Sequence, residues 1–251
     1  MISALFPRSR TLPALLLLAS ASVASAEAPL RGPAWHAPRQ PNGILTGTIV
    51  FLSAGHGWTA DDQDTVPKDG KFGWYTQRGV STDAKIVEDY GNQDQANAFA
   101  LYAFNAGATV VPMRGIGYQK NEVIVDNDDT TVKWQGDWKD AKESVYYGLR
   151  GAVPFRTAAI TRSTSPSARA TYTPNIPEEG FYPVYTWAGH GANRVNQEYV
   201  VRHSGGESAV RVNHRRIGCG WVWLGTYHFE KGRLGGVEIT NSAPGFSRRT
   251  D

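Results

Sequence analysis

The sequence predicts an α+β protein, in which a partial α/β region of the βαβ type precedes an all-β sandwich. Residues 44–122 contain one stretch of helical periodicity between two short apolar runs, which is the order of elements in a βαβ unit. From residue 126 to residue 242 short aromatic and β-branched runs alternate with turn signals instead. Closely spaced short strands of this kind are typical of a β-sandwich.

The residue types and their spacing predict where each element of the βαβ unit lies. Residues 47–52 are apolar and rich in β-formers, which predicts a buried strand. A helix over residues 92–106 follows from one apolar face at helical spacing, made by Ala96, Phe99, Ala100, Ala103 and Phe104. Gly107 is a natural residue to end that helix. Residues 109–113 predict a second strand, parallel to the first and joined to it by a right-handed crossover.

The sandwich is predicted from strands over residues 182–187, 198–203, 208–214, 221–229 and 237–240. The sequence Ser-Gly-Gly-Glu at 204–207 predicts a hairpin between the second and third of these. His203 and His214 end the paired strands, and we expect both to point outward. In the following strand we expect the aromatic residues to share one face, namely Trp221, Trp223, Tyr227 and Phe229.

The chain begins with the pattern of a cleavable secretion signal over residues 1–26. Arg8 and Arg10 precede a short apolar run at 12–19, and Ala-Ser-Ala at 24–26 is a small-residue cleavage site. The apolar run is too short to span a bilayer, so we expect no transmembrane segment in the exported chain. A proline-rich linker over 27–43 and a disordered tail over 243–251 are expected at its two ends. The protein is therefore expected in the periplasm, on the cell surface or outside the cell.

Charge and cysteine content narrow the classes of partner and site. Loss of Arg8 and Arg10 with the signal reduces the net charge from +3 to +1, which offers no basic face for nucleic acid. Cys219 is the only cysteine, so an intrachain disulfide and a multi-cysteine zinc site are both excluded. Any metal site would have to use histidine and carboxylate ligands.

His56 is the sharpest candidate for such a ligand. It follows the strand at 47–52 between two glycines, and ligands of open α/β sheets gather at the carboxyl ends of strands. Glu88 lies just before the predicted helix and can turn toward the same edge, which would give two of the three protein ligands of a catalytic zinc. The alternative is a turn histidine and a carboxylate that stabilises the helix N-terminus.

A resemblance to a known enzyme family bears on these two residues. Residues 49–57 (Ile-Val-Phe-Leu-Ser-Ala-Gly-His-Gly) resemble the first strand and Gly-His-Gly motif of zinc-dependent N-acetylmuramoyl-L-alanine amidases. Residues 87–90 with the helix after them resemble the family's second block. The resemblance implies zinc held by His56 and Glu88, with Asp89 as the alternative, and hydrolysis of the peptidoglycan amide bond. The family takes its remaining zinc histidine and its catalytic glutamate from later strands, for which we find no match, so the enzyme is expected to be truncated and inactive, and no catalytic residue is assigned.

The second half of the chain resembles the golvesin C-terminal-like domain, also described as xanthan-lyase carbohydrate-binding-like. The matching stretches lie at 170–174, 180–185, 212–216 and 220–227, and the resemblance covers residues 126–242. It implies an alternative function, a non-catalytic module that binds carbohydrate or the cell surface. The expected partner is cell-wall peptidoglycan or an extracellular polysaccharide. A structural envelope protein with neither activity is the third interpretation.

Three smaller groups of residues each have a ligand-binding interpretation and a simpler structural one. Asp126, Asp128 and Asp129 can bind calcium but fit a solvated turn better. His190 is expected to be a loop residue without a metal. Flat aromatic rings suit sugar binding, and the tryptophans considered for it are Trp134, Trp138, Trp187, Trp221 and Trp223. We expect one or two of them at the surface and the others in the core.

Overall fold

A computed structural model describes residues 38–55, 58–61, 73–76, 88–141, 146–147 and 155–243. The predicted secretion signal, most of the predicted linker and the predicted tail from residue 244 lie outside these ranges. No helix in the described part of the chain has the length and apolar character needed to cross a membrane.

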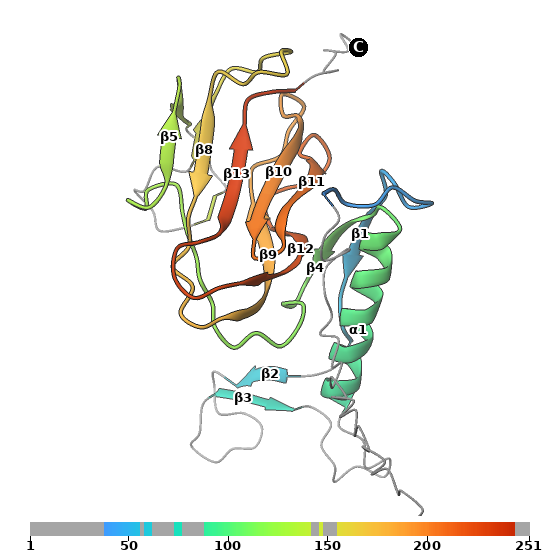
Figure 1. The fold of residues 1–251 in the computed structure, drawn as a ribbon. Helices are drawn as coiled ribbons and strands as arrows, with labels where there is room; N and C mark the ends of the chain where they lie inside the picture. The colour runs from blue at the N-terminus through green and yellow to red at the C-terminus, as the bar shows by residue number, and fades with distance from the viewer. Residues whose placement is uncertain are drawn as a thin grey trace, which may run out of the picture.

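The fold is mostly β, with two main sheets and, in the described residues, a single helix, α1 (Glu88–Asn105) (Figure 1). A four-stranded sheet has the order β1 (Ile49–Leu52), β4 (Thr109–Pro112), β12 (Trp221–Phe229) and β9 (Gly180–Trp187). A five-stranded sheet has the order β11 (Gly206–Asn213), β10 (Asn196–His203), β13 (Gly236–Thr240), β8 (Arg169–Tyr172) and β5 (Lys133–Gln135). Two separate hairpins pair β2 (Trp58–Asp61) with β3 (Gly73–Thr76), and β6 (Lys139–Ala141) with β7 (Phe155–Thr157).

The βαβ unit is confirmed. β1 and β4 are parallel, with Ile49 opposite Thr109, and α1 connects them and packs on them. The helix begins four residues earlier than predicted, and Gly107 ends it in a left-handed conformation with φ of +94°. The expected apolar face differs at one position, because Phe99 is 52% exposed whereas Asn97 is fully buried beside Ala100. The buried face is therefore centred nearer to Asn97 and Phe104 than the sequence pattern suggested.

The βαβ unit and the β-rich half share one sheet. β12 pairs antiparallel with β4, with Trp223 opposite Val110, and both side chains are almost fully buried. The four-stranded sheet therefore runs from β1 at one edge to β9 at the other, across both predicted regions. The limits at 44–122 and 126–242 stay predictions, but the two regions are joined by backbone hydrogen bonds and by a common core.

A β-bulge in β12 corrects the expectation that its four aromatic residues share a face. Trp223 lies opposite Tyr185 but Gly225 lies opposite Val184, so Leu224 is an extra residue and the alternation of faces reverses there. On the α1 side, the ring of Trp223 lies 5.0 Å from that of Phe104. On the other side, Tyr227 stacks on His203 of the five-stranded sheet at 4.7 Å. One strand thereby supplies aromatic side chains to two packing layers.

Residues near the start of the described chain fasten α1 to the edge of the five-stranded sheet. The backbone N–H of Gln40 donates to Ala209 O of β11, and Ala209 N–H donates to Pro38 O. The side-chain amide of Gln40 donates to the carbonyl oxygens of Phe104 at 3.1 Å and of Ala108 at 2.8 Å. These bonds reach one carbonyl group in the last turn of α1 and one just before β4.

Gly225→Ala tests the bulge. Gly225 has φ of +118°, and a Cβ atom there would lie 2.7 Å from the Tyr227 hydroxyl oxygen, which donates a hydrogen bond to Leu224 O. Gly232→Ala is the matched control, because Gly232 also has a positive φ (+99°) but has no atom within 4 Å of the added carbon. We expect the control to lose about 1 kcal/mol of unfolding free energy and Gly225→Ala to lose about 2–3 kcal/mol more, measured by urea denaturation. Equal losses in the two variants would show that the packing against Tyr227 is unimportant.

Candidate functional site

The two predicted metal ligands cannot be placed as side chains. His56 lies outside the described residues, and Glu88 is the first residue of α1 but its side chain is not described. At the carboxyl end of β1, the guanidinium of Arg114 donates to Gly55 O at 3.2 Å. Within the described ranges no group of three or more His, Cys, Asp or Glu residues is arranged to hold a metal. The assignment of His56 and Glu88 as zinc ligands therefore stays a prediction.

A cavity of about 890 Å³ follows β9. β9 is an edge strand, since β12 is its one partner among the described strands. Eight consecutive residues from Tyr182 to Gly189 line the cavity, and so do residues 112–117 and 119–127 from the connection between β4 and β5. The inner face of the five-stranded sheet contributes Tyr172, Tyr199, Val237 and Ile239. The site therefore lies where the two sheets of the sandwich meet at an open edge.

Aromatic side chains gather at one part of this cavity. Trp221 is 39% exposed, and its ring lies 5.0 Å from that of Tyr147 and 6.4 Å from that of Tyr185. Trp187 is the cross-strand partner of Trp221 and lines the cavity too. Trp223, by contrast, is 1% exposed and belongs to the core. Of the five tryptophans weighed above, Trp221 is the exposed one, as expected for one or two of them.

Buried tyrosine hydroxyls supply the polar part of the lining. Burial raises the pKa of Tyr172 and of Tyr185 to about 12 in each case, so both hydroxyls stay protonated at neutral pH. The Tyr185 hydroxyl oxygen accepts the backbone N–H of Ile116 at 2.6 Å, which ties the β4–β5 connection to β9. The arrangement combines flat apolar rings with neutral groups that both donate and accept hydrogen bonds, and this suits a ligand rich in hydroxyl groups.

A buried tyrosine–histidine pair forms another part of the wall. The Tyr199 hydroxyl lies 2.7 Å from Nε2 of His214, and Nδ1 of His214 lies 2.9 Å from Ile217 O. Because a carbonyl oxygen only accepts, Nδ1 carries the proton and Nε2 accepts from Tyr199. Burial lowers the pKa of His214 despite the opposing bond to Ile217, and the charges of Arg194 and His190 lower it further. The imidazole is therefore neutral at pH 7.

The structure corrects the expected orientation of two histidines. His203 and His214 are both buried, at 8% and 5% exposure, and neither points outward. In the antiparallel register, His203 stands on the same face of β10 as Tyr199 and Val201, which form the inner face of the sheet. Nε2 of His203 lies 3.1 Å from the Ser208 hydroxyl, and the backbone N–H of Gly205 donates to Nδ1. These bonds assign both histidines to the framework of the sandwich.

The remaining predicted groups have local partners. The carboxylate of Asp129 accepts the backbone N–H of Asp126 at 2.7 Å, and that of Asp126 accepts the N–H of Asn127 at 2.7 Å, so these residues form a turn as expected. Asp128 and Asp129 are exposed in this turn, whereas Asp126 is half-buried. His190 is exposed, with Nδ1 3.4 Å from the Cys219 sulfur. The tyrosine–histidine pair and the cavity were not predicted from the sequence.

Comparison with known proteins identifies the β-rich half. The family model of the golvesin C-terminal domain matches residues 123–248. A xanthan lyase from Bacillus sp. (strain GL1) is 35% identical over 126 residues, which cover 49% of this chain but only 13% of that enzyme. The solved structure of a Paenibacillus xanthan lyase is 30% identical, with a TM-score of 0.42 over 48% of this chain and 11% of that one. The resemblance to the golvesin domain is confirmed, and nothing in these comparisons supports an amidase domain.

The neutral His214 predicts a pH-dependent stability. Its pKa in the folded protein lies below the unfolded value of 6.5, so the unfolded chain binds more protons and stability falls as the pH drops below about 6.5. Between about pH 7.5 and 5.5 we expect a loss of at most about 1.4 kcal/mol per pH unit from this group. His214→Asn keeps a donor for Ile217 O and should remove this component, measured by thermal unfolding across the pH range. An unchanged pH profile in the variant would contradict the assignment.

Proposed function

The chain belongs to the golvesin C-terminal domain family, and on that premise we propose that it is an exported, non-catalytic protein that binds a carbohydrate. The export part of the proposal rests on the signal pattern at residues 1–26. The carbohydrate part is supported by the similarity to an enzyme named for its action on xanthan, a polysaccharide. The expected partner is an extracellular polysaccharide or cell-wall peptidoglycan.

The cavity along β9 is the observation that carries the proposal. Its volume of about 890 Å³ lies within the range of about 300–1,000 Å³ that is usual for ligand sites. A sugar ring has apolar C–H faces and a rim of hydroxyl groups, so it needs flat aromatic surfaces together with hydrogen-bond partners. Trp221 and Trp187 offer the first, and the hydroxyls of Tyr172 and Tyr185 offer the second.

Edge-strand geometry adds further hydrogen-bond partners. The backbone of an edge strand directs part of its N–H and C=O groups away from its neighbour in the sheet. The second half of β9 lines the cavity, so its outward N–H and C=O groups lie beside Trp187 and Trp221. Phe181 O, at the start of the strand, accepts from the side-chain amide of Gln119 at 3.1 Å. A bound saccharide would make the same kind of bond farther along β9.

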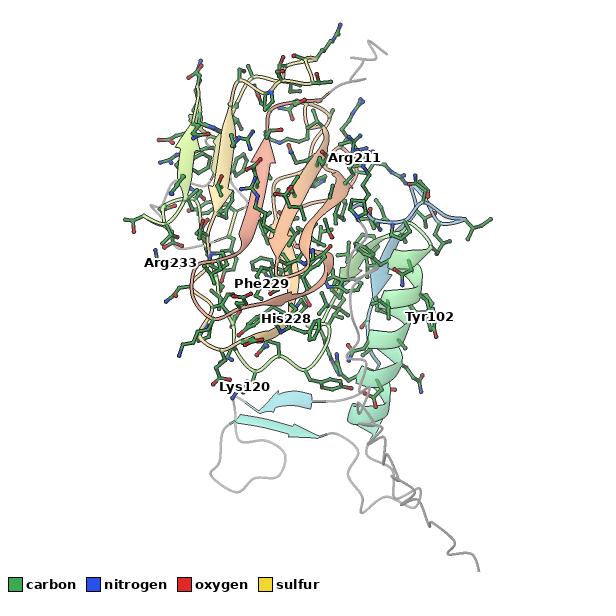
Figure 2. The ribbon with its side chains drawn as sticks, viewed as in Figure 1. Tyr102, Lys120, Arg211, His228, Phe229 and Arg233 are labelled. Carbon is green, nitrogen blue, oxygen red and sulfur yellow. The ribbon has the colours of Figure 1, made fainter. Side chains whose placement is uncertain are left out.

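Trp221→Ala tests this site. Tyr102→Ala is the matched control, because Tyr102 is 74% exposed on α1 and points away from the sheets (Figure 2). We expect the tryptophan variant to bind xanthan or purified peptidoglycan about 3- to 10-fold more weakly, which corresponds to about 0.5–1.5 kcal/mol, and the control to bind like the unaltered chain. Co-sedimentation with the insoluble polymer or titration with soluble fragments measures this. Failure of the unaltered chain to bind either polymer would overturn the proposal.

A second proposal, a zinc amidohydrolase of the N-acetylmuramoyl-L-alanine amidase type, rests on the βαβ unit. His56 follows β1 by four residues in the sequence, and Glu88 is the first residue of α1, which packs on β1 and β4. This proposal predicts about one zinc ion per chain by elemental analysis, lost in His56→Ala and retained in His190→Ala. A chain that contains no zinc and cleaves no peptidoglycan amide would eliminate it and leave the binding proposal intact.

A further inference from the structure

Two arginine side chains of the cavity are held against aromatic rings. The guanidinium carbon of Arg156 lies 4.7 Å from the centre of the Trp134 ring, and that of Arg194 lies 4.9 Å from the centre of the Phe155 ring. Both arginines line the cavity along β9. Phe155 and Arg156 are neighbours on β7, so their side chains leave opposite faces of that strand, and the two guanidinium groups occupy separate positions in the lining. Stacking of this kind fixes the plane of a guanidinium and limits its rotamers.

The charged residues of the lining are mainly positive. Among the described residues the cavity is lined by four cationic side chains, Arg114, Lys120, Arg156 and Arg194, and by two acidic ones, Glu122 and Asp126. Lys120 forms an ion pair with Glu178 at 3.0 Å, and Arg156 forms one with Asp140 at 3.0 Å. Burial raises the pKa of Asp126, which makes its negative charge less favourable.

The charge of Arg194 acts inside the cavity. It contributes to the lowered pKa of His214, whose imidazole belongs to the buried pair in the cavity wall. The guanidinium stacks on the ring of Phe155, and the loop that carries Arg194 is closed by the backbone N–H of Arg194, which donates to Gly191 O at 3.0 Å. The cation is thus positioned by both its backbone and its side chain.

We propose that the cavity is selective for an acidic saccharide, and that Arg194 and Arg156 are two separate positions in it that hold a carboxylate. The planar fork of a guanidinium matches a carboxylate in a bidentate manner, and such charge-assisted hydrogen bonds are roughly twice as strong as neutral ones. Asp140 accepts the Nε–H of Arg156, and a guanidinium has five N–H donors in all. This inference rests on the proposed carbohydrate-binding function and adds the chemical class of the ligand.

The test compares two ligands that differ by one carboxylate. The full chain is titrated with a tetrasaccharide of β-1,4-linked glucose and with the same tetrasaccharide whose terminal sugar is oxidised to glucuronic acid. At low salt we expect at least about 10-fold tighter binding of the acidic ligand, and we expect this preference to shrink as ionic strength rises. Arg194→Gln and Arg156→Gln should each reduce the preference, and Arg156→Lys should restore only part of it because the ammonium has no planar fork.

Arg211→Gln is the matched control. Arg211 is paired with Glu198 at 2.9 Å on the outer face of the five-stranded sheet and lies outside the cavity lining (Figure 2). Its loss should leave the preference unchanged. In histidine NMR spectra, the pKa of His214 should rise when the acidic ligand binds, because a bound carboxylate offsets the charge of Arg194, and should stay constant with the neutral ligand.

The outcomes separate this inference from the proposed function. Binding of both tetrasaccharides with equal affinity, unaffected by Arg194→Gln, overturns the inference and leaves carbohydrate binding in place. Binding of neither ligand, together with no binding to polysaccharide, overturns both. A preference for the acidic ligand that disappears equally in Arg211→Gln would show a general effect of surface charge, and would also overturn the assignment to the cavity.

Discussion

The reversal of alternation at Leu224 is the constraint on which the rest of the structure depends. Before it, β12 directs Trp223 toward α1, and after it the same strand directs Tyr227 toward the five-stranded sheet. Without the extra residue, the aromatic side chains of β12 would all lie on one face of the sheet. Either the layer against α1 or the layer between the two sheets would then lack its large aromatic side chains. Gly225 makes the turn of the backbone possible, because its φ of +118° is unfavourable for any residue with a Cβ atom.

The candidate site follows from where that strand stands in the sheet. β12 is buried on both faces and takes β4 on one side and β9 on the other, which leaves β9 at the edge. The five-stranded sheet extends past this edge through β13, β8 and β5, so its inner residues are not fully covered by strands of the other sheet. The unequal width of the two sheets thus opens a cavity, and the connection between β4 and β5 forms part of its wall. Tyrosine, tryptophan and arginine side chains give that cavity its chemical character.

Local patterns in the sequence predicted the helix and the strands β1, β4, β9, β10, β11, β12 and β13, but not the short strands β2, β3, β5, β6, β7 and β8 or the pairing of distant strands. The βαβ unit and the hairpin of β10 and β11 were predicted because periodicity, glycine positions and turn residues act over short distances. The pairing of Val110 with Trp223 and the bulge at Leu224 depend on residues far apart in the chain, for which a single sequence carries no signal. His203 could have been placed correctly, since strict alternation from Tyr199 and Val201 puts it on the inner face. The cavity depends on the order of strands in the two sheets and on the path of the β4–β5 connection, and local patterns predict neither.

The pairing of β4 with β12 also governs the order in which the chain can fold. The two strands are separated by more than a hundred residues, and Gln40 is joined to Ala209 across a longer interval still. Proteins dominated by such distant contacts have high contact order and fold slowly, because loop closure precedes the contacts that compensate for it. When the chain is made from its N-terminus, β1, α1 and β4 are complete long before β12. Their contacts with β12 form only after residue 229 has been added. During that interval the edge of β4 and the ring of Phe104 lack their contacts with β12, and exposed apolar surface and unpaired strand edges of this kind favour aggregation.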